Sequence, residues 1–194
     1  EAGGPPAPAR AVRRVCNDFG ISVKRHRSIS SLQRDLAVCR RCVEAGFPLE
    51  SLPVVHGGAG RRAYLFGQAP GIVEGAEGRP WRGRAGQTLR RWLRLDEEGF
   101  YATFYCASVT RCYPGRPASG RGDRTPTAAE QRLCRDWHEE ELRLLRPELV
   151  ITVGLLAARN VIGATTLTGR KMPSFCGTCS GVRASSSSSV RITK

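Results

Sequence analysis

The sequence predicts an α/β protein with a short parallel sheet between two layers of helices. Three apolar segments, at residues 63–66, 100–109 and 147–154, are each followed by a stretch in which apolar side chains recur at helical spacing. Strands that alternate with helices pair in parallel through right-handed crossovers. The chain has 194 residues, enough for one domain with a real hydrophobic core. We therefore expect one three-layer α/β/α domain over residues 30–167.

The two ends of the chain have a different composition. Residues 1–29 begin with Pro, Ala and Gly without periodicity and continue as a weakly patterned basic stretch, so we expect them to be disordered or weakly ordered. Residues 168–194 contain five consecutive serines and no convincing strand or helix pattern. This second segment is predicted to be a low-complexity tail.

The first helix is expected to begin near Ser30 or Ser31, because serine is a favourable N-cap residue. It leads into the pair Cys39-x-x-Cys42. The predicted strand at residues 63–66 comes next and opens into a long glycine-rich loop.

The glycine-rich loop that ends near residue 86 is the most distinctive stretch of the sequence. Loops of this kind bring main-chain N–H groups close to a ligand, and ligands of open α/β sheets bind at the carboxyl ends of strands. Trp81, between Pro80 and Arg82, offers a flat aromatic face beside the loop. A helix over residues 86–95 follows, and three of its side chains are predicted to face the core. They are Leu89, Trp92 and Leu93.

Aromatic and β-branched residues at 100–109 indicate a second strand. Thr127 and Glu130 have the spacing of a capping box and predict a helix that runs to about residue 145. The apolar run at 147–154, bounded by Pro and Gly, is typical of a buried parallel strand, and a helix over 155–162 completes the unit. Three side chains of the long helix are expected to face inward: Leu133, Cys134 and Trp137.

The formal net charge is +14, with 31 Lys and Arg against 17 Asp and Glu. Most of the cations are arginine, whose forked guanidinium suits phosphate oxygens. A polyanionic partner is therefore expected, and a merely soluble basic surface is the alternative.

The chain contains eight cysteines. We see neither a signal peptide with an apolar central region nor an apolar run of membrane-spanning length, so we expect a reduced, cytoplasmic setting without membrane contact. In such a setting, two C-x-x-C pairs favour a metal over disulfides. The pairs are Cys39 with Cys42 and Cys176 with Cys179.

Several motifs follow one another in the order found in one protein family. They are GQAPG at 67–71, GRPWRGRAGQTL at 78–89, SVTRCYPG at 108–115, Cys134, and ELVITVG at 148–154. This ordered set resembles the iron–sulfur uracil-DNA glycosylases of the family 4 type. The similarity covers about residues 32–163 and implies the fold of that family.

The resemblance implies a [4Fe–4S] cluster held by four thiolates, which is the ligand set such a cluster needs. The matching positions are Cys39, Cys42, Cys112 and Cys134. Two alternatives remain: Cys112 and Cys134 are ordinary buried thiols, or the two C-x-x-C pairs bind zinc. The 21 residues between Cys112 and Cys134 are more than we expect of the family, and they include a basic loop at 116–124.

The resemblance also implies a reaction, the hydrolysis of the bond between uracil and deoxyribose in single- or double-stranded DNA after base flipping. By match, the first loop is expected to bind uracil and position the attacking water through Gly67, Gln68, Ala69 and Gly71. The protein is expected to be a monomer. Trp81 takes the place of the residue that stacks on the base, and a core aromatic is the alternative reading.

Two positions depart from the family pattern. Gln68 replaces the acid of the usual GEAPG, so the carboxylate beside the water is expected to be Glu74 or Glu77, either of which is otherwise simply solvated. Ser108 stands where an Asn usually reads the uracil edge. One hydroxyl cannot match the paired donor and acceptor of an amide, so relaxed base selectivity is expected.

A further departure concerns the family's His-Pro-Ser motif, whose His donates to the leaving base. The histidines of this chain are His26, His56 and His138, all before Gly154. We therefore expect the sheet to lack its final strand and the site to lack that His. The rival hypotheses are a catalytically impaired nucleic-acid-binding homologue and a nucleotide-binding protein, the latter disfavoured because no Lys-Ser or Lys-Thr pair follows the loop.

Overall fold

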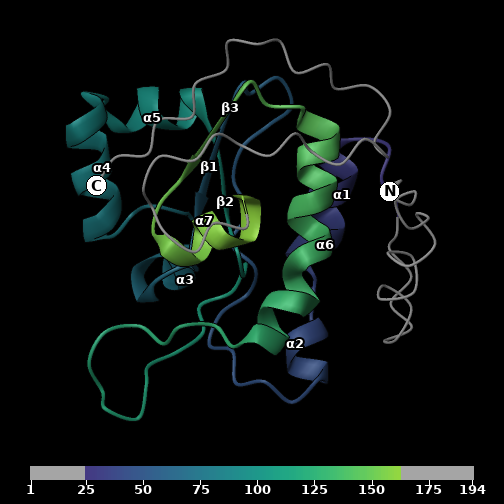
Figure 1. Ribbon diagram of the computed structural model, residues 1–194, viewed down its shortest axis with the longest axis vertical. Helices are drawn as coiled ribbons and strands as arrows, with labels where there is room; N and C mark the ends of the chain where they lie inside the picture. The colour runs from purple at the N-terminus through teal and green to yellow at the C-terminus, as the bar shows by residue number, and fades with distance from the viewer. Residues whose placement is uncertain (1–24, 163–194) are drawn as a thin grey trace, which may run out of the picture.

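The computed structural model describes residues 25–162 and shows a three-stranded parallel sheet in the order β2-β1-β3 (Figure 1). The strands are β1 (Ala63–Gly67), β2 (Phe104–Ser108) and β3 (Leu149–Thr152). Strand β1 lies in the centre and pairs with both neighbours, so that Gly67 lies opposite Ser108 and Phe66 opposite Thr152. The carboxyl ends of all three strands therefore meet at one edge of the sheet.

Helices cover both faces of this sheet. Those of the described part of the chain are α1 (Ile29–Ala37), α2 (Arg41–Glu44), α3 (Ile72–Glu77), α4 (Arg84–Leu93), α5 (Glu97–Thr103), α6 (Ala128–Leu145) and α7 (Leu155–Ile162). None of the helices in residues 25–162 is long and apolar enough to cross a membrane.

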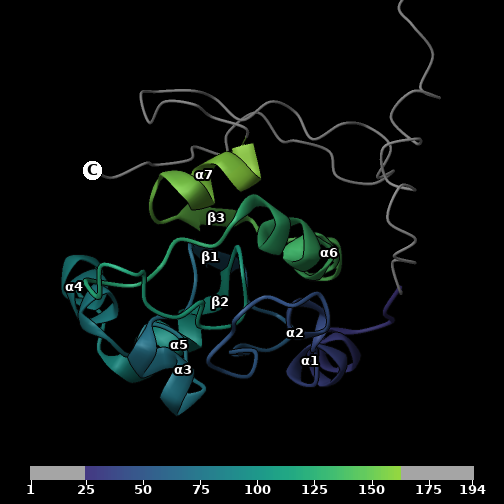
Figure 2. The ribbon, with the colours of Figure 1, turned by 90° about the horizontal axis from the view of Figure 1, so that it is seen from below.

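The side chains of β1 alternate between the two faces, as the period of a strand requires. Tyr64 and Phe66 pack toward α6 and α7, whereas Ala63 and Leu65 pack toward α4 and α5. Figure 2 shows the sheet between these two groups of helices. The predicted three-layer α/β/α fold is confirmed.

The first helix begins earlier than predicted. Its N-cap is Ser28, whose hydroxyl accepts from the main-chain N–H of Ser31, and Ser31 closes the capping box from inside the helix. His26 is buried, so the packed part of the chain begins before residue 30. The expectations for residues 1–24 and 168–194 lie outside the described residues.

The predicted strand at residues 100–109 is wrong in its first half. Residues up to Thr103 belong to α5, because the Asp96 carboxylate caps that helix by accepting from the main-chain N–H of Gly99 at 2.7 Å. Strand β2 begins only at Phe104. The aromatic residues Phe100 and Tyr101 are buried from the helix rather than from the sheet.

Helices α3 and α4 correct the sequence analysis at two further points. Helix α3 lies inside the stretch predicted to be loop, where the density of glycines hid a short helix. Helix α4 starts at Arg84 rather than at residue 86, and Trp92, predicted to face the core, is 64% exposed. Leu89 and Leu93 do pack against the sheet.

A buried ion pair joins the end of β2 to α6. The Arg111 guanidinium donates to the Glu141 carboxylate, and these two residues are 2% and 0% exposed. The hydroxyls of Tyr64 and Tyr105 donate to the same carboxylate at 2.6 and 2.8 Å. Burial and the nearby Glu141 carboxylate raise the pKa of Tyr64, so its phenol stays protonated and remains a donor.

Helix α6 begins at the predicted capping box, which is confirmed. Thr127 Oγ1 accepts from the main-chain N–H of Glu130, and the Glu130 carboxylate accepts from that of Thr127 at 2.7 Å. The Arg124 guanidinium adds two hydrogen bonds to this carboxylate, at 2.9 and 2.7 Å. Hydrogen bonding to Arg124 lowers the pKa of Glu130, which therefore stays ionised although it is buried.

We expect the substitution Glu141→Gln to destabilise the fold by about 3–5 kcal/mol, because it leaves the Arg111 cation buried without its counter-ion. Urea unfolding at pH 7, followed by tryptophan fluorescence, measures the change. The matched control is Glu148→Gln, which removes an exposed ion pair with Arg62 and should leave the unfolding midpoint unchanged. A loss below about 1 kcal/mol for Glu141→Gln would contradict a structural role for the pair.

Candidate active site

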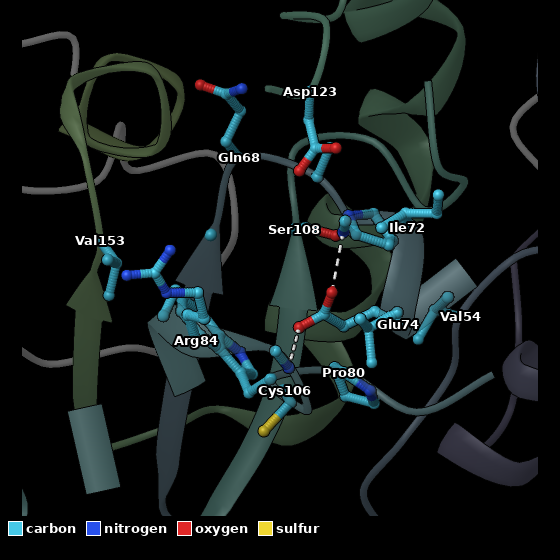
Figure 3. A pocket seen from close by; sticks show the side chains of 18 of the residues that line it. Val54, Gln68, Ile72, Glu74, Pro80, Arg84, Cys106, Ser108, Asp123 and Val153 are labelled. Atoms are coloured by element: carbon cyan, nitrogen blue, oxygen red, sulfur yellow. Dashed lines mark hydrogen bonds between the residues drawn. The ribbon is translucent and has the colours of Figure 1, made fainter. Parts of the chain in front are cut away.

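A cavity of about 440 Å³ opens at the carboxyl edge of the sheet (Figure 3). All three strand ends contribute to it, through Gly67 at the end of β1, Ser108 at the end of β2 and Val153 after β3. This is the position at which open parallel sheets bind ligands, and the volume suits a small organic ligand.

The GQAPG loop forms one wall of the cavity. The predicted residues Gly67, Gln68, Ala69 and Gly71 all line it. The carbonyl oxygens of Gly67 and Gln68 accept from the main-chain N–H groups of Val109 and Thr110, at 3.0 and 3.3 Å. The loop is thus tied to the exit of β2, the strand that ends at Ser108.

Glu74 also lines the cavity, and each of its carboxylate oxygens accepts a main-chain hydrogen bond. One accepts from the main-chain N–H of Gly71 at 3.1 Å and the other from that of Gly83 at 2.8 Å. These glycines are the N-caps of α3 and α4, so one carboxylate holds both helix starts, where its charge is favourable. Its contacts support a positioning role rather than the catalytic role expected from the sequence.

Glu77, the other carboxylate considered from the sequence, does not line the cavity. Its Oε2 accepts from Arg82 Nε at 2.7 Å on the surface of the loop. A signal for the role of Glu74 was present in the sequence, because a glutamate three residues after a glycine N-cap is typical of a helix start.

Trp81 lies over the end of β1 in an unusual backbone conformation. Its φ angle is 61°, in the left-handed region that few non-glycine residues adopt. A Cβ added to Gly67 would lie 2.9 Å from the indole ring, and one added to Gly86 only 1.8 Å from the Trp81 carbonyl oxygen. Side-chain-free residues at both positions are therefore required to seat the tryptophan.

The indole of Trp81 lies between the hydrophobic core and the cavity. It packs against the core cluster that contains Leu65 and Phe100, and it also lines the cavity. Its carbonyl oxygen accepts from Arg90 Nη1 at 2.8 Å. The two readings of Trp81 from the sequence, core aromatic and cavity wall, describe two sides of the same ring.

Ser108 contributes its hydroxyl to the cavity, and the hydroxyl donates to the Thr110 carbonyl oxygen at 2.6 Å. Because the proton is used in this bond, the oxygen faces the cavity as an acceptor. None of the three histidines of the chain lines the cavity. His138 packs on the Phe66 ring, and burial lowers its pKa to about 3, so it is neutral.

Two charged residues of the cavity were not singled out from the sequence. Arg84, the first residue of α4, extends into it, and the Asp123 carboxylate approaches it from the loop before α6 (Figure 3). Arg84 lay inside a quoted motif without a role. Asp123 carried no sequence signal, since it lies in the long basic loop and only the path of that loop brings it to Gly71.

The four predicted cluster cysteines come together on the side of the molecule where α2 meets α6. Cys42, Cys112 and Cys134 line one small cavity with Glu130. Burial raises the pKa of Cys42 to about 11 and of Cys112 to about 12, and the neighbouring thiols, Cys39 among them, add to both effects. Burial likewise raises the pKa of Cys134, with Cys42 and Cys112 contributing.

The donor chemistry of this group fits an all-thiolate cluster. The four cysteines come from the turn after α1, from α2, from the exit of β2 and from α6, and Cys39 and Cys42 lie near enough to Cys112 to affect its pKa. Among residues 25–162, no three His, Cys, Asp or Glu side chains lie close enough together to share a single metal ion. The alternative zinc set includes Cys176 and Cys179, which lie outside the described residues.

The comparisons with known proteins show the family of the chain. The model of the Uracil DNA glycosylase superfamily matches residues 55–190, and the chain belongs to that superfamily. The match therefore runs past residue 163, where the resemblance of motifs ended.

Curated relatives place the chain near one branch of that superfamily. It is 29% identical over 135 residues to the Type-4 uracil-DNA glycosylase of Archaeoglobus fulgidus, covering 68% of this chain and 62% of the relative. It is 30% identical over 121 residues to the Type-4 uracil-DNA glycosylase of Thermotoga maritima, covering 61% and 59%. The chain thus spans about three fifths of the length of these relatives.

The role of Glu74 as a link between two helix starts can be tested by Glu74→Gln. The amide keeps one acceptor but turns its NH₂ group toward a glycine N–H, so we expect a loss of about 1–3 kcal/mol in unfolding free energy. Hydrogen exchange of the Gly71 and Gly83 amides should become faster in the same variant. The control is Glu77→Gln on the same helix, and equal behaviour of the two variants would exclude the proposed link.

Proposed function

We propose that this chain is a DNA glycosylase that hydrolyses the N-glycosidic bond of uracil, or of a related deaminated base, flipped out of DNA. The observation that carries the proposal is the cavity at the strand ends, where the GQAPG loop, the Trp81 ring and Ser108 face one space. Membership of the superfamily and the names of the type-4 relatives support the same reaction class.

The cavity offers a flipped pyrimidine a stacking face and a hydrogen-bond acceptor. The Trp81 ring provides a flat face for stacking, and Gly67 and Gly71 line the cavity without side chains. The Ser108 oxygen is an acceptor for the imide N–H of uracil. Since a single hydroxyl reads only one group of the base edge, other deaminated bases should also be accepted.

The charge of the chain suits the phosphate backbone. The net charge is +14, and Arg84 presents its guanidinium at the cavity itself. Contacts between arginine and phosphate release counter-ions, so binding should weaken steeply as salt is raised. Such contacts also offset the cost of a few kcal/mol for unstacking the target base.

An iron–sulfur cluster would be held by Cys39, Cys42, Cys112 and Cys134. When bound, a [4Fe–4S] cluster would supply a covalent tie among these segments rather than chemistry at the cavity, from which the four sulfurs are separate. The cluster would join three parts of the chain: the start of its packed region, the exit of β2, and α6.

Base release tests the function directly. Purified protein is incubated with single- and double-stranded DNA containing one uracil, with uracil-free DNA as the control, and free uracil is measured. Release supports the proposal. Tight, salt-dependent binding without release would favour the catalytically impaired nucleic-acid-binding homologue instead, and nucleotide affinity without DNA affinity would favour the nucleotide-binding protein.

Trp81→Ala should weaken binding of uracil-containing DNA about 10- to 100-fold, because base stacking on an aromatic ring contributes about 1–3 kcal/mol. Affinity for uracil-free DNA should change little. The matched control is Trp92→Ala, which removes an exposed tryptophan of α4 that does not line the cavity. Equal losses in the two variants would contradict the stacking role.

The cluster has its own test in the metal content of the protein. Anaerobically purified protein should contain iron and acid-labile sulfide in equal amounts and absorb visible light, and Cys134→Ala should lose both. Cys106→Ala is the control, because Cys106 is a buried thiol outside the group of four. A colourless protein that contains zinc would contradict the assignment.

A further inference from the structure

We propose that Asp123 is the carboxylate that orients the attacking water and accepts its proton. The inference rests on the proposed glycosylase function and adds a catalytic residue to it. Among residues 25–162, two acidic side chains line the cavity, Glu74 and Asp123. Both oxygens of Glu74 accept from main-chain N–H groups and its side chain is buried, whereas Asp123 is exposed, so Asp123 is the carboxylate better placed to meet a water molecule.

The backbone next to Asp123 is firmly anchored although the residue itself is exposed. The main-chain N–H of Arg124 donates to the Gly115 carbonyl oxygen at 2.8 Å, and its guanidinium Nε donates to that of Pro114 at 2.9 Å. The same guanidinium donates two hydrogen bonds to the buried carboxylate of Glu130. This anchor turns the preceding side chain, Asp123, toward the cavity.

The Asp123 carboxylate meets the GQAPG loop at Gly71. A Cβ built on Gly71 would lie 3.1 Å from Asp123 Oδ2, so the absence of a side chain there lets the carboxylate approach the loop. In Figure 3 the Asp123 carboxylate points toward the side of the cavity where Ser108 lies, whereas the Gln68 amide points away.

Among the charged and titratable groups around Asp123, the Tyr113 phenol interacts with its carboxylate. Arg124 is turned to Glu130, and Arg84 lies at the opposite side of the cavity. Tyr113 is adjacent: burial, then the Asp123 carboxylate, raises the pKa of this phenol, and Arg116 lies near it. Glu74 is held by the two glycine amides.

The chemical step requires a group that can take a proton. A glutamine side chain cannot do so near neutral pH, which excludes Gln68, whereas an aspartate can. The water oxygen forms a bond to C1′ of the deoxyribose while the bond from C1′ to N1 of uracil breaks, and its electron pair leaves with the base. The proton lost by the water passes to the Asp123 carboxylate and from there to solvent.

The test compares Asp123→Asn with Glu98→Gln, an exposed residue of α5 outside the cavity whose substitution changes the net charge equally. Single-turnover release of uracil is measured across pH, together with affinity for DNA carrying a non-hydrolysable deoxyuridine analogue. Asp123→Asn should slow release at least about 100-fold, as expected for loss of a general base. Affinity should stay within about threefold, and the rise of the rate with pH should disappear.

Asp123→Glu serves as the second variant, because it keeps the carboxylate and should recover part of the rate and its pH dependence. Release by Asp123→Asn within about threefold of the unaltered chain would overturn the inference and leave the glycosylase function standing. A parallel loss of affinity and rate with an unchanged pH profile would also overturn it, since it indicates a DNA contact. Absence of release by the unaltered chain would overturn both proposals.

Discussion

The buried pair of Arg111 and Glu141 is the constraint on which most of the structure depends. A desolvated guanidinium is tolerable only beside a carboxylate, and a carboxylate with no exposed surface needs several donors, which the two tyrosines supply. One donor comes from the central strand, one from β2 and one from the loop after it. The helix α6 is therefore fixed against the sheet in a single position.

That position has consequences at both functional regions of the molecule. The residue after Arg111 is Cys112, and Cys134 lies on the helix that carries Glu141, so the ion pair sets the distance between two of the four thiols. The main-chain carbonyl of Arg111 also accepts from the N–H of Val54, which lines the large cavity. The cysteine group and the cavity are thus both connected to the Arg111–Glu141 pair.

The cavity depends on a second set of contacts, made by a carboxylate and by glycines that have no side chain. The Glu74 carboxylate holds two helix starts together, and glycines at 67 and 86 make room for the ring and backbone of Trp81. The strained conformation of Trp81 is kept by this surrounding structure, as is common at binding sites. Substrate contacts and loop stability are therefore coupled at the same residues.

Much of the fold could be read from the sequence, because alternating strands and helices, the capping box of α6 and the order of the motifs are local signals. The reading failed where two local signals competed. At residues 100–103, aromatic content suggested a strand, but the Asp96 cap decided for a helix. At Trp92, helical spacing suggested burial, but the sheet is covered by the neighbouring turn of α4, and the ring faces outward.

The sequence by itself determined the fold class, the family, the excess of positive charge and the residues of the GQAPG loop, all of which are properties of composition and short motifs. Only the tertiary structure decided which carboxylate bonds to main-chain N–H groups and which is exposed at the cavity. Glu74 and Asp123 are 49 positions apart in sequence, and the sequence gives no measure of which one meets main-chain donors and which one meets the cavity. That difference arises because parallel strands bring their carboxyl ends, and the loops that follow them, to one edge of the sheet.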